Sequence, residues 1–271
     1  MPELPEVETT RSGLAPLLEG QRILAARVHE RRLRWRLPAG FEGALEGRRV
    51  LGVHRRAKYL LIATDGGTLL VHLGMSGSLR VAAPESPRQL HDHVELLLSS
   101  GRCIRFNDPR RFGSMHVVDG DPLLHPLLRG LGPEPLSADF DAAYLHARTR
   151  GRRVAIKQLL MNAAIVVGVG NIYASEALFR ARVSPGRAAG RLSRAEIARL
   201  VLAIQRVLAA AIRVGGTTLR DYVNAEGSPG YFRQKLYVYE RAGQPCRRCG
   251  TPIRQRVQGQ RSTYWCASCQ S

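Results

Sequence analysis

The sequence of 271 residues has no long hydrophobic run, and no stretch approaches the ~18 consecutive apolar residues that a membrane-spanning helix needs. The acidic opening, MPELPE, also lacks the basic and apolar regions of a secretory signal peptide. No internal repeat or low-complexity tract is present. These absences predict a soluble, intracellular, globular protein.

Acidic residues are scarce in this sequence. Asp and Glu number 22 against 41 Lys and Arg, so the formal net charge is +19, and most of the excess is arginine. Because arginine binds phosphate through two parallel hydrogen bonds and stacks on bases, this balance favours nucleic acid as the partner. An ordinary soluble protein from an arginine-rich proteome is the alternative that charge alone leaves open.

Cysteine is also rare, with five residues, and structural disulfides are uncommon inside cells. Cys246 and Cys249 form one C-x-x-C pair, and 16 residues separate it from a second pair, Cys266 and Cys269. Four thiolates at this spacing predict a closed, structural zinc site. An iron–sulfur cluster and disulfides are the alternatives, and Cys103, in an apolar segment, is expected in the core.

The segment between the two cysteine pairs is basic, and it includes Arg254, Arg256 and Arg261. A module this short buries little core without its metal. Zinc is therefore expected to hold a hairpin that turns these side chains outward, toward nucleic acid.

The segment from Ile23 to about Val118 predicts an antiparallel sandwich or barrel. Short runs rich in Val, Ile and Leu, such as YLLIAT, TLLVHL and CIRF, alternate with the turn sequences DGG and SSG. Before them, the apolar spacing over residues 5–18 predicts a short helix that Pro16 interrupts or restarts. One domain is therefore expected to end near residues 133–135.

Helical patterns dominate the next part of the chain. Ser193 and Glu196 form a capping-box sequence, and helical apolar spacing continues from there to Gly215. Shorter helices are expected over residues 152–161 and 171–183, and residues 226–234 are rich in turn formers. The sequence thus predicts an α+β protein of three parts: a β-sandwich domain with a preceding helix (1–133), a helical domain (134–234) and a four-cysteine zinc finger (235–271).

Two loops carry residues suited to nucleic acid, and each also has a structural interpretation. GVGNIYASE, residues 168–176, runs from a glycine-rich loop into a helix start, where backbone N–H groups favour phosphate. Asn171 stands at the expected N-cap, so helix capping explains the pattern as well. DPRRFG, residues 108–113, places two arginines beside Phe112, which fits either a residue pushed into a base stack or a turn whose ring packs inward.

Four other residues have ordinary structural explanations when each is taken alone. Lys58 begins an apolar strand and is expected in solvent at the sheet edge, whereas Met75 is expected in the core. His91 and His93 have no third ligand nearby in sequence, which favours hydrogen bonding over metal binding.

The order of the motifs resembles the bacterial formamidopyrimidine-DNA glycosylases, also called 8-oxoguanine-DNA glycosylases. The resemblance runs over nearly the full length through PELPE, RRAKYLL, HLGMSG, DPRRFG, GVGNIYASE, GGTTLRDY, GYF and the four-cysteine module. Leu4 and the DPRRFG loop point to this branch and away from the endonuclease VIII branch, which typically begins PEGPE. One departure is MNAAIV at residues 161–166, where the family commonly carries an acidic and then a basic residue.

This resemblance implies a monomeric, bifunctional repair enzyme of the bacterial cytoplasm with one structural zinc ion and a helix-two-turns-helix element. It would excise 8-oxoguanine and formamidopyrimidines from double-stranded DNA and then cleave the abasic strand by β,δ-elimination. The implied catalytic residues are Pro2 as nucleophile at C1′, Glu3 as proton donor to the opening sugar, Lys58 in β-elimination and Arg261 in δ-elimination.

The resemblance also implies a set of DNA-contacting residues. Met75, Arg110 and Phe112 would fill the void left by a flipped base, and the segment from Gly216 to Tyr231 would cover the lesion. The full set of implied contacts is His72, Met75, His91, Arg110, Phe112, Arg152, Asn171 and Arg261.

The chemistry of MPELPE suits this role. Pro5 and Glu6 have a structural explanation, since proline fits the first turn of a helix and acidic residues fit its positive end. Removal of Met1 would leave Pro2 with a free secondary amine. An α-amine titrates near ~7.7–8.0 and lysine near ~10.4, so the terminal amine is more often neutral and nucleophilic. Its condensation with an aldehyde gives an iminium with no N–H to lose, which is a lasting electron sink.

Two other classes of protein explain part of the sequence. A non-catalytic zinc-ribbon DNA-binding protein accounts for the charge and the cysteines but gives Pro2, Glu3 and Lys58 no role; salt-dependent binding without cleavage would favour it. An N-terminal-proline tautomerase accounts for Pro2 alone, and turnover of a small keto acid would favour that class.

Overall fold

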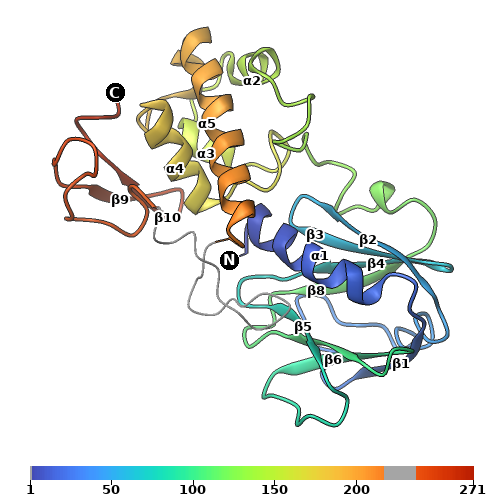
Figure 1. Cartoon of the computed structure of the whole chain (residues 1–271). Coiled ribbons are helices and arrows are strands. Elements are labelled where there is room, and N and C mark those ends of the chain that lie inside the picture. The colour runs from blue at the N-terminus through green and yellow to red at the C-terminus, as the bar shows by residue number, and fades with distance from the viewer. Residues whose placement is uncertain (1, 217–235) are drawn as a thin grey trace. The chain divides into compact units, whose positions relative to one another are not determined.

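The computed structural model describes residues 2–216 and 236–271, which divide into two compact units (Figure 1). Within the described residues, the first unit contains 2–129 and 214–216, and the second contains 130–213 and 236–271. The turn-rich segment 226–234, the GYF motif and most of GGTTLRDY lie outside the described residues. In the described ranges, no helix combines the length and the apolar character needed to cross a membrane.

The first unit is an antiparallel β-sandwich preceded by a helix, which confirms the predicted fold. One sheet has the strand order β1-β6-β7-β5 and the other β2-β3-β4-β8. Asp65 and Gly66 form the two-residue turn between β3 and β4, as the DGG sequence predicts. The strands are β1 (Ile23–Val28), β2 (Val50–Arg56), β3 (Tyr59–Thr64), β4 (Gly67–His72), β5 (Ser78–Ala82), β6 (Asp92–Leu98), β7 (Cys103–Asn107) and β8 (Ser114–Val118).

Helix α1 (Leu4–Leu18) continues through Pro16, so the prediction that this proline interrupts the helix was wrong. A proline removes one backbone donor, and here the loss falls in the last turn of the helix. Leu14 and Leu18, on either side of it, are fully buried. Packing of these two side chains therefore holds the last turn in place.

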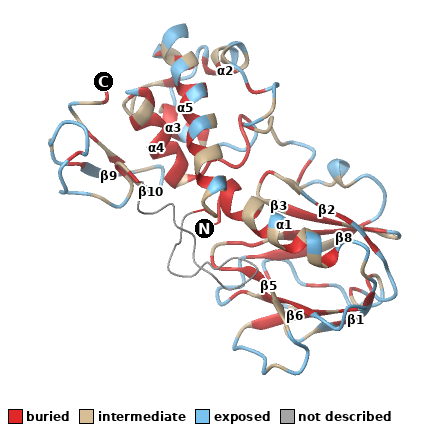
Figure 2. Ribbon diagram, viewed as in Figure 1, coloured by how far each residue is buried: buried red, intermediate tan, exposed pale blue. Residues whose placement is uncertain are grey.

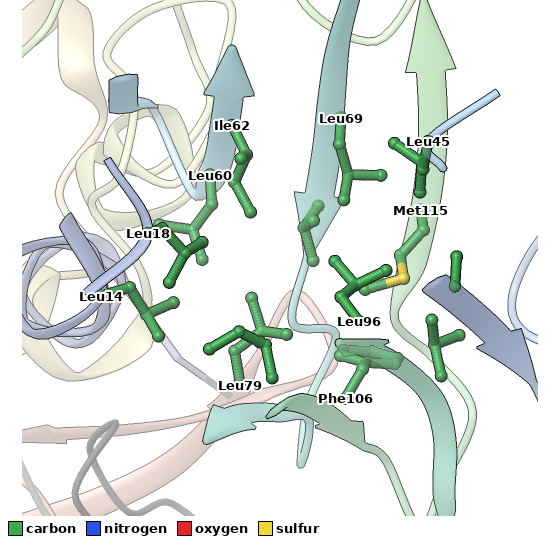
Figure 3. Close-up of a cluster of buried hydrophobic side chains, with 14 of the residues drawn as sticks. Leu14, Leu18, Leu45, Leu60, Ile62, Leu69, Leu79, Leu96, Phe106 and Met115 are labelled. Atoms are coloured by element: carbon green, nitrogen blue, oxygen red, sulfur yellow. The ribbon is translucent and has the colours of Figure 1, made fainter. Parts of the chain in front are cut away.

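Side chains from the helix and from both sheets form one core (Figure 3). Leu14 and Leu18 of α1 lie beside residues of β3, and residues of β6 and β7 face residues of β4 and β8. Cys103 is buried, as predicted, although its sulfur lies 3.7 Å from Glu95 Oε1 and not among the side chains of this cluster. The side chains labelled in the close-up are Leu14, Leu18, Leu45, Leu60, Ile62, Leu69, Leu79, Leu96, Phe106 and Met115.

A buried arginine holds the loop between β5 and β6. Arg105 of β7 is 1% exposed, and its guanidinium donates to the carbonyl oxygens of Pro84, Ser86 and Pro87 and to Ser86 Oγ at 2.8–3.3 Å. These bonds satisfy a charge that would otherwise be costly to bury. The loop leading to His91 is thereby fixed to the sheet.

The second unit packs helices with a two-stranded hairpin. Its elements are α2 (Ala142–Thr149), α3 (Ile156–Leu160), α4 (Asn171–Ala181), α5 (Arg194–Arg213), β9 (Arg254–Gln258) and β10 (Arg261–Trp265), with a 3-10 turn at Ala189–Arg191; another 3-10 turn, Pro122–Leu124, belongs to the first unit. Helix α4 is buried along most of its length, whereas α5 keeps one exposed face (Figure 2). The capping box at α5 is confirmed, since the N–H groups of Ser193 and Glu196 each donate to the other residue's side chain.

The helices between 134 and 165 differ from expectation. Helix α2 was not predicted, although Asp141 caps it by accepting from Tyr144 N at 2.7 Å. Helix α3 is shorter than the predicted 152–161, because Ala155 pairs with Ala188 in a β-bridge and holds the preceding residues extended. In the MNAAIV departure, Asn162 Oδ1 accepts from Ala164 N at 3.0 Å, which forms an Asx-turn just after the end of α3.

Candidate active site and DNA-binding loops

The start of α1 is a capping box that places two carboxylates near Pro2. Glu3 is the N-cap, and its backbone N–H donates to Glu6 Oε2 at 2.9 Å. Both carboxylates are buried, and Pro5 lies in the first turn. Pro5 and Glu6 thus have the predicted structural role, and Pro2 lies directly before the N-cap of the helix.

The hairpin of β2 and β3 presents Lys58. Arg56 pairs with Tyr59, so Ala57 and Lys58 form a two-residue turn, and Lys58 lies one residue before the strand that it was predicted to begin. Ala57 has a left-handed φ of +56°. The turn projects from the sheet at the end where β3 meets β4 at the pair Tyr59 and His72.

His72 lies beside this turn and is neutral at pH 7. Its ring centroid is 4.8 Å from that of Tyr59. Burial, followed by the charges of Lys58 and Arg34, lowers the pKa of His72 to about 4. Its Nδ1 accepts from Gly74 N at 3.0 Å, which leaves the ring proton on Nε2. A neutral imidazole of this tautomer donates one hydrogen bond to an acceptor such as a phosphate oxygen.

Three loops that carry predicted DNA contacts meet at one edge of the β1-β6-β7-β5 sheet. Asn107, the last residue of β7, pairs with Ser78, the first residue of β5, and with Asp92, the first residue of β6. The segment with Met75 leads into β5, the segment with His91 leads into β6, and the DPRRFG loop leaves β7. The register therefore brings Met75, His91, Arg110 and Phe112 to the same sheet edge.

Asp108 holds these loops together. It is fully buried, and its carboxylate accepts from Ser76 Oγ at 3.1 Å and from Gly113 N at 2.7 Å. Its backbone N–H donates to His91 O at 3.1 Å, and its carbonyl lies 2.8 Å from His93 Nε2. One residue therefore connects all three loops, and His93 serves hydrogen bonding as predicted.

The DPRRFG loop exposes its tip and buries its ends. Asp108 and Gly113 are buried, whereas Arg110 and Phe112 are exposed, with the Arg110 guanidinium 4.9 Å from the centre of the Phe112 ring. Phe112 is 45% exposed, so the alternative in which its ring packs inward was wrong. An exposed aromatic on an anchored loop is suited to entering a base stack.

The hairpin of β9 and β10 presents Arg261 at its tip. Gly259 and Gln260 both have positive φ, of +57° and +59°, as a two-residue turn of this kind requires. Lys157 Nζ, buried in α3, donates to Ser262 O at 3.1 Å and to Thr263 Oγ1 at 2.8 Å. The residues after Arg261 are thereby fixed to the helices.

Asn171 also binds this hairpin, through Nδ2 to Ser262 O at 3.0 Å. The N-cap of α4 is Gly170, and Asn171 is the first helical residue, so its predicted place was wrong by one position. Because Gly170 occupies the N-cap position, the Asn171 side chain is not needed there and can bond to the hairpin. Arg152 is exposed in the loop before α3, where its carbonyl accepts from Gly190 N.

The four predicted cysteines form a metal-binding cluster. The sulfurs of Cys246, Cys249, Cys266 and Cys269 all lie within 4.8 Å of one another. The separations are 4.0 Å between Cys246 and Cys269, and 3.5 Å from Cys249 to each of Cys266 and Cys269. Tetrahedral bonds of ~2.3 Å to zinc put sulfurs about 3.8 Å apart. The cluster fits one structural zinc ion with no open coordination position.

The sequence did not predict the roles of three buried residues. They are Asp108, which connects the three loops, Lys157 and Glu176. Glu176 of α4 is 1% exposed and accepts from the backbone N–H groups of Tyr237, Val238 and Tyr239 at 2.9–3.1 Å. Burial raises the pKa of Glu176, against the effect of these bonds. The feature of the sequence that could have indicated such buried residues is a charged residue inside an otherwise apolar helical or strand segment.

Three family models match successive parts of the chain. They are the formamidopyrimidine-DNA glycosylase N-terminal domain at residues 1–115, the H2TH domain of the same glycosylase at 131–223, and the zinc finger found in FPG and IleRS at 243–271.

Full-length relatives carry the same name. The chain is 60% identical to the formamidopyrimidine-DNA glycosylase of Thioalkalivibrio sulfidiphilus and 56% identical to that of Alkalilimnicola ehrlichii, with all of each chain covered.

Solved structures agree with the sequence relatives. The MutM (Fpg) protein of Thermus thermophilus aligns with a TM-score of 0.89 at 44% identity, over 99% of this chain and 98% of that one. Lactococcus lactis Fpg in complex with DNA containing an abasic site aligns with a TM-score of 0.92 at 34% identity, over 99% of both chains. The wild-type Lactococcus lactis protein in complex with DNA containing N7-benzyl-Fapy-dG gives a TM-score of 0.92 at 33% identity, over 100% of both chains.

Proposed function

The chain belongs to the formamidopyrimidine-DNA glycosylase family, and we propose that it acts through a Schiff base on Pro2. It is a bifunctional DNA glycosylase and abasic-site lyase that excises oxidised purines, including formamidopyrimidine lesions, in base-excision repair. Removal of Met1 frees the amine of Pro2, which attacks C1′ of the damaged nucleoside and expels the base. Glu3 protonates the opening sugar, and the product is an iminium at C1′.

Strand cleavage follows from this iminium in two eliminations. Its positive charge draws electrons from C2′ after a proton leaves that carbon, and the 3′ phosphate departs in β-elimination. Lys58 acts as the proton donor in this step, and Arg261 acts in the δ-elimination that releases the 5′ phosphate. The anchoring of the hairpin by Lys157 and Asn171 supports this role, because chemistry at the sugar needs a fixed guanidinium.

The proposed mode of DNA binding rests on one observation. The strand register brings the loops with four residues to the same edge of the sheet: Met75, His91, Arg110 and Phe112. A base must leave the stack before C1′ becomes accessible. The buried Asp108, the exposed Arg110 and Phe112 and the half-buried Met75 together supply an anchored wedge for the vacated space. His72, Arg152 and Asn171 are assigned to phosphate contacts.

Each of the three predicted parts has its own task in this proposal. The first part, residues 1–133, carries the nucleophile and the loops that hold Met75, His91 and Phe112. The second part, 134–234, carries the helix-two-turns-helix element. The third part, 235–271, carries the zinc-held hairpin with Arg261. Zinc holds the finger fold when bound, and the eliminations use this chain's own side chains. The site of action is the DNA of the bacterial nucleoid, in the cytoplasm, where the substrate lies.

Borohydride trapping tests the proposal. The purified protein is incubated with a duplex that contains one 8-oxoguanine opposite cytosine, the iminium is reduced, and the adduct is mapped by mass spectrometry. An adduct on Pro2 is expected. An adduct on Lys58 or on another amine would refute the assignment of the nucleophile, and intact salt-sensitive binding with no adduct would favour a non-catalytic binder.

A matched control retains a short leader before Pro2. The leader converts the secondary amine into an amide, which is not nucleophilic, so both base excision and trapping are expected to disappear while binding remains. Full base excision by the extended protein would contradict the mechanism.

A further inference from the structure

Leu90 is 82% exposed, the highest value among the large hydrophobic side chains of the described residues. Single exposed leucines are ordinary on protein surfaces. Leu90 differs because it lies directly before His91, at the sheet edge that carries the loops assigned to DNA.

The backbone around Leu90 is fixed on both sides. Asp92 N donates to Gln89 O at 3.1 Å, and Gln89 N donates to Asp92 Oδ2 at 2.8 Å, which closes a tight turn. Asn107 Nδ2 donates to Leu90 O at 3.1 Å and to Asp92 Oδ1 at 2.9 Å. Leu90 therefore stands in water on a rigid turn and not on a loose loop.

The bonds of Asn107 also connect the turn at Leu90 to the DPRRFG loop. Asn107 is the residue before Asp108, and Asp108 N donates to His91 O. His91 has a φ of +78°, a left-handed conformation that is uncommon outside glycine and persists where the surroundings fix it. The turn and the DPRRFG loop therefore form one anchored assembly with two exposed apolar side chains, Leu90 and Phe112.

We propose that Leu90 is a further DNA-contacting residue, which packs its aliphatic side chain against sugar and base surfaces of the duplex near the site of Phe112. This inference rests on the proposed function, in which the DPRRFG loop faces DNA. Leucine is among the side chains that bind DNA as apolar wedges.

The charges around the turn favour a polyanion over another protein surface. Arg88, two residues before Leu90, is exposed, as is Arg110 on the DPRRFG loop, whereas Arg111 of that loop forms an ion pair with Glu30 at 3.5 Å. One exposed carboxylate, Glu85, lies in the same connection between β5 and β6. An apolar contact surrounded mainly by arginines suits the sugars and bases between phosphates.

The test compares Leu90→Ser with Leu124→Ser. Leu124 is 72% exposed in the same unit and lies beyond the far end of β8. Dissociation constants are measured by fluorescence anisotropy, at two salt concentrations, on a duplex with an uncleavable abasic-site analogue. We expect Leu90→Ser to weaken binding about fivefold to tenfold, and about tenfold corresponds to 1.4 kcal/mol.

The salt slope separates this contact from a phosphate contact. Loss of an apolar contact releases no counterion, so the slope should stay at the wild-type value. Leu124→Ser should bind as the wild type does, Leu90→Met should restore most of the affinity, and neither serine variant should change the melting temperature.

Equal binding by Leu90→Ser and the wild type, with Pro2 still trapped by borohydride, would overturn the role of Leu90 and leave the proposed function intact. Absence of trapping in the wild type would instead overturn the proposed function. A change in oligomeric state of Leu90→Ser by light scattering, without a change in DNA affinity, would assign Leu90 to contact with a second copy and refute DNA contact.

Discussion

At the scale of single residues, the motifs of the sequence predict the exposed chemistry well and the buried support poorly. Pro2, Lys58 and Arg261 stand in patterns that are visible in sequence. Asp108 and Lys157 were missed as supports because burial and hydrogen-bond partners depend on contacts between distant segments. Lys157 reaches Thr263 across 106 positions of the chain, which no local pattern reveals.

His72 should make stability depend on pH. Its folded pKa of about 4 lies below the ordinary 6.5, so the unfolded chain takes up a proton first as the pH falls. The free energy of unfolding should therefore fall between pH 6.5 and 4. Over that whole range, His72 alone should account for a loss of about 3 kcal/mol. Urea titrations across that window should show a shallower drop for His72→Gln.

His54 supplies the control for this titration, because it is exposed on β2. His54→Gln should follow the wild-type pH dependence. A steep acid-side loss that persists in His72→Gln would show that other groups cause it.

Lys157→Met should impair δ-elimination more than base excision. The change removes two bonds to the residues after Arg261, and a misplaced catalytic group costs on the order of tenfold to a hundredfold in rate. Gel analysis of the β- and β,δ-elimination products measures the ratio. Arg199→Met, which also removes one positive charge but at an exposed position of α5, should keep the wild-type ratio, and an unchanged ratio in Lys157→Met would contradict the anchoring role.

At the scale of elements, periodicity and turn residues predict the strands and the long helix α5, whereas short elements depend on their surroundings. Helix α3 loses its expected first turn to a β-bridge. Gly74 shows a similar dependence at loop scale. Its φ is +65°, and a Cβ there would lie 2.4 Å from Gly113 N and 2.5 Å from Phe112 C.

Gly74→Ala should therefore cost more than backbone strain alone. Gly101 has a similar φ of +75° with nothing within 4 Å of its Cβ position, so Gly101→Ala isolates the strain, about 1–2 kcal/mol. Gly74→Ala should lose at least about 3 kcal/mol and weaken binding to abasic DNA. Chemical denaturation and anisotropy measure both, and equal losses for the two variants would contradict the close approach of the two loops.

At the scale of the whole molecule, composition and cysteine spacing predict the partner and the metal. The division of the chain is less readable, because residues 236–271 group with the helices by contact although their composition stands apart. The bonds from Lys157, Asn171 and Glu176 to the region around the finger explain that grouping.

Zinc removal should act on the finger first. The four cysteine sulfurs lie within 4.8 Å of one another, and a module this short depends on its metal for folding, so chelation should unfold the hairpin that presents Arg261. DNA affinity and δ-elimination should fall, and proteolysis should begin after residue 242. Full affinity in metal-free protein, verified by elemental analysis, would refute this dependence.

The buried Arg105 sets a limit on recoding this arginine-rich chain. Its guanidinium serves four acceptors at once in the loop of Pro84, Ser86 and Pro87, and a lysine ammonium has only three donors on a differently shaped head. Exposed arginines that have neither such a planar set of partners nor a role in the proposed site tolerate exchange for lysine, because they contribute mainly charge. A lysine-recoded version of this protein would keep its field around DNA, but it would have to retain arginine at position 105 as well as at positions 110 and 261.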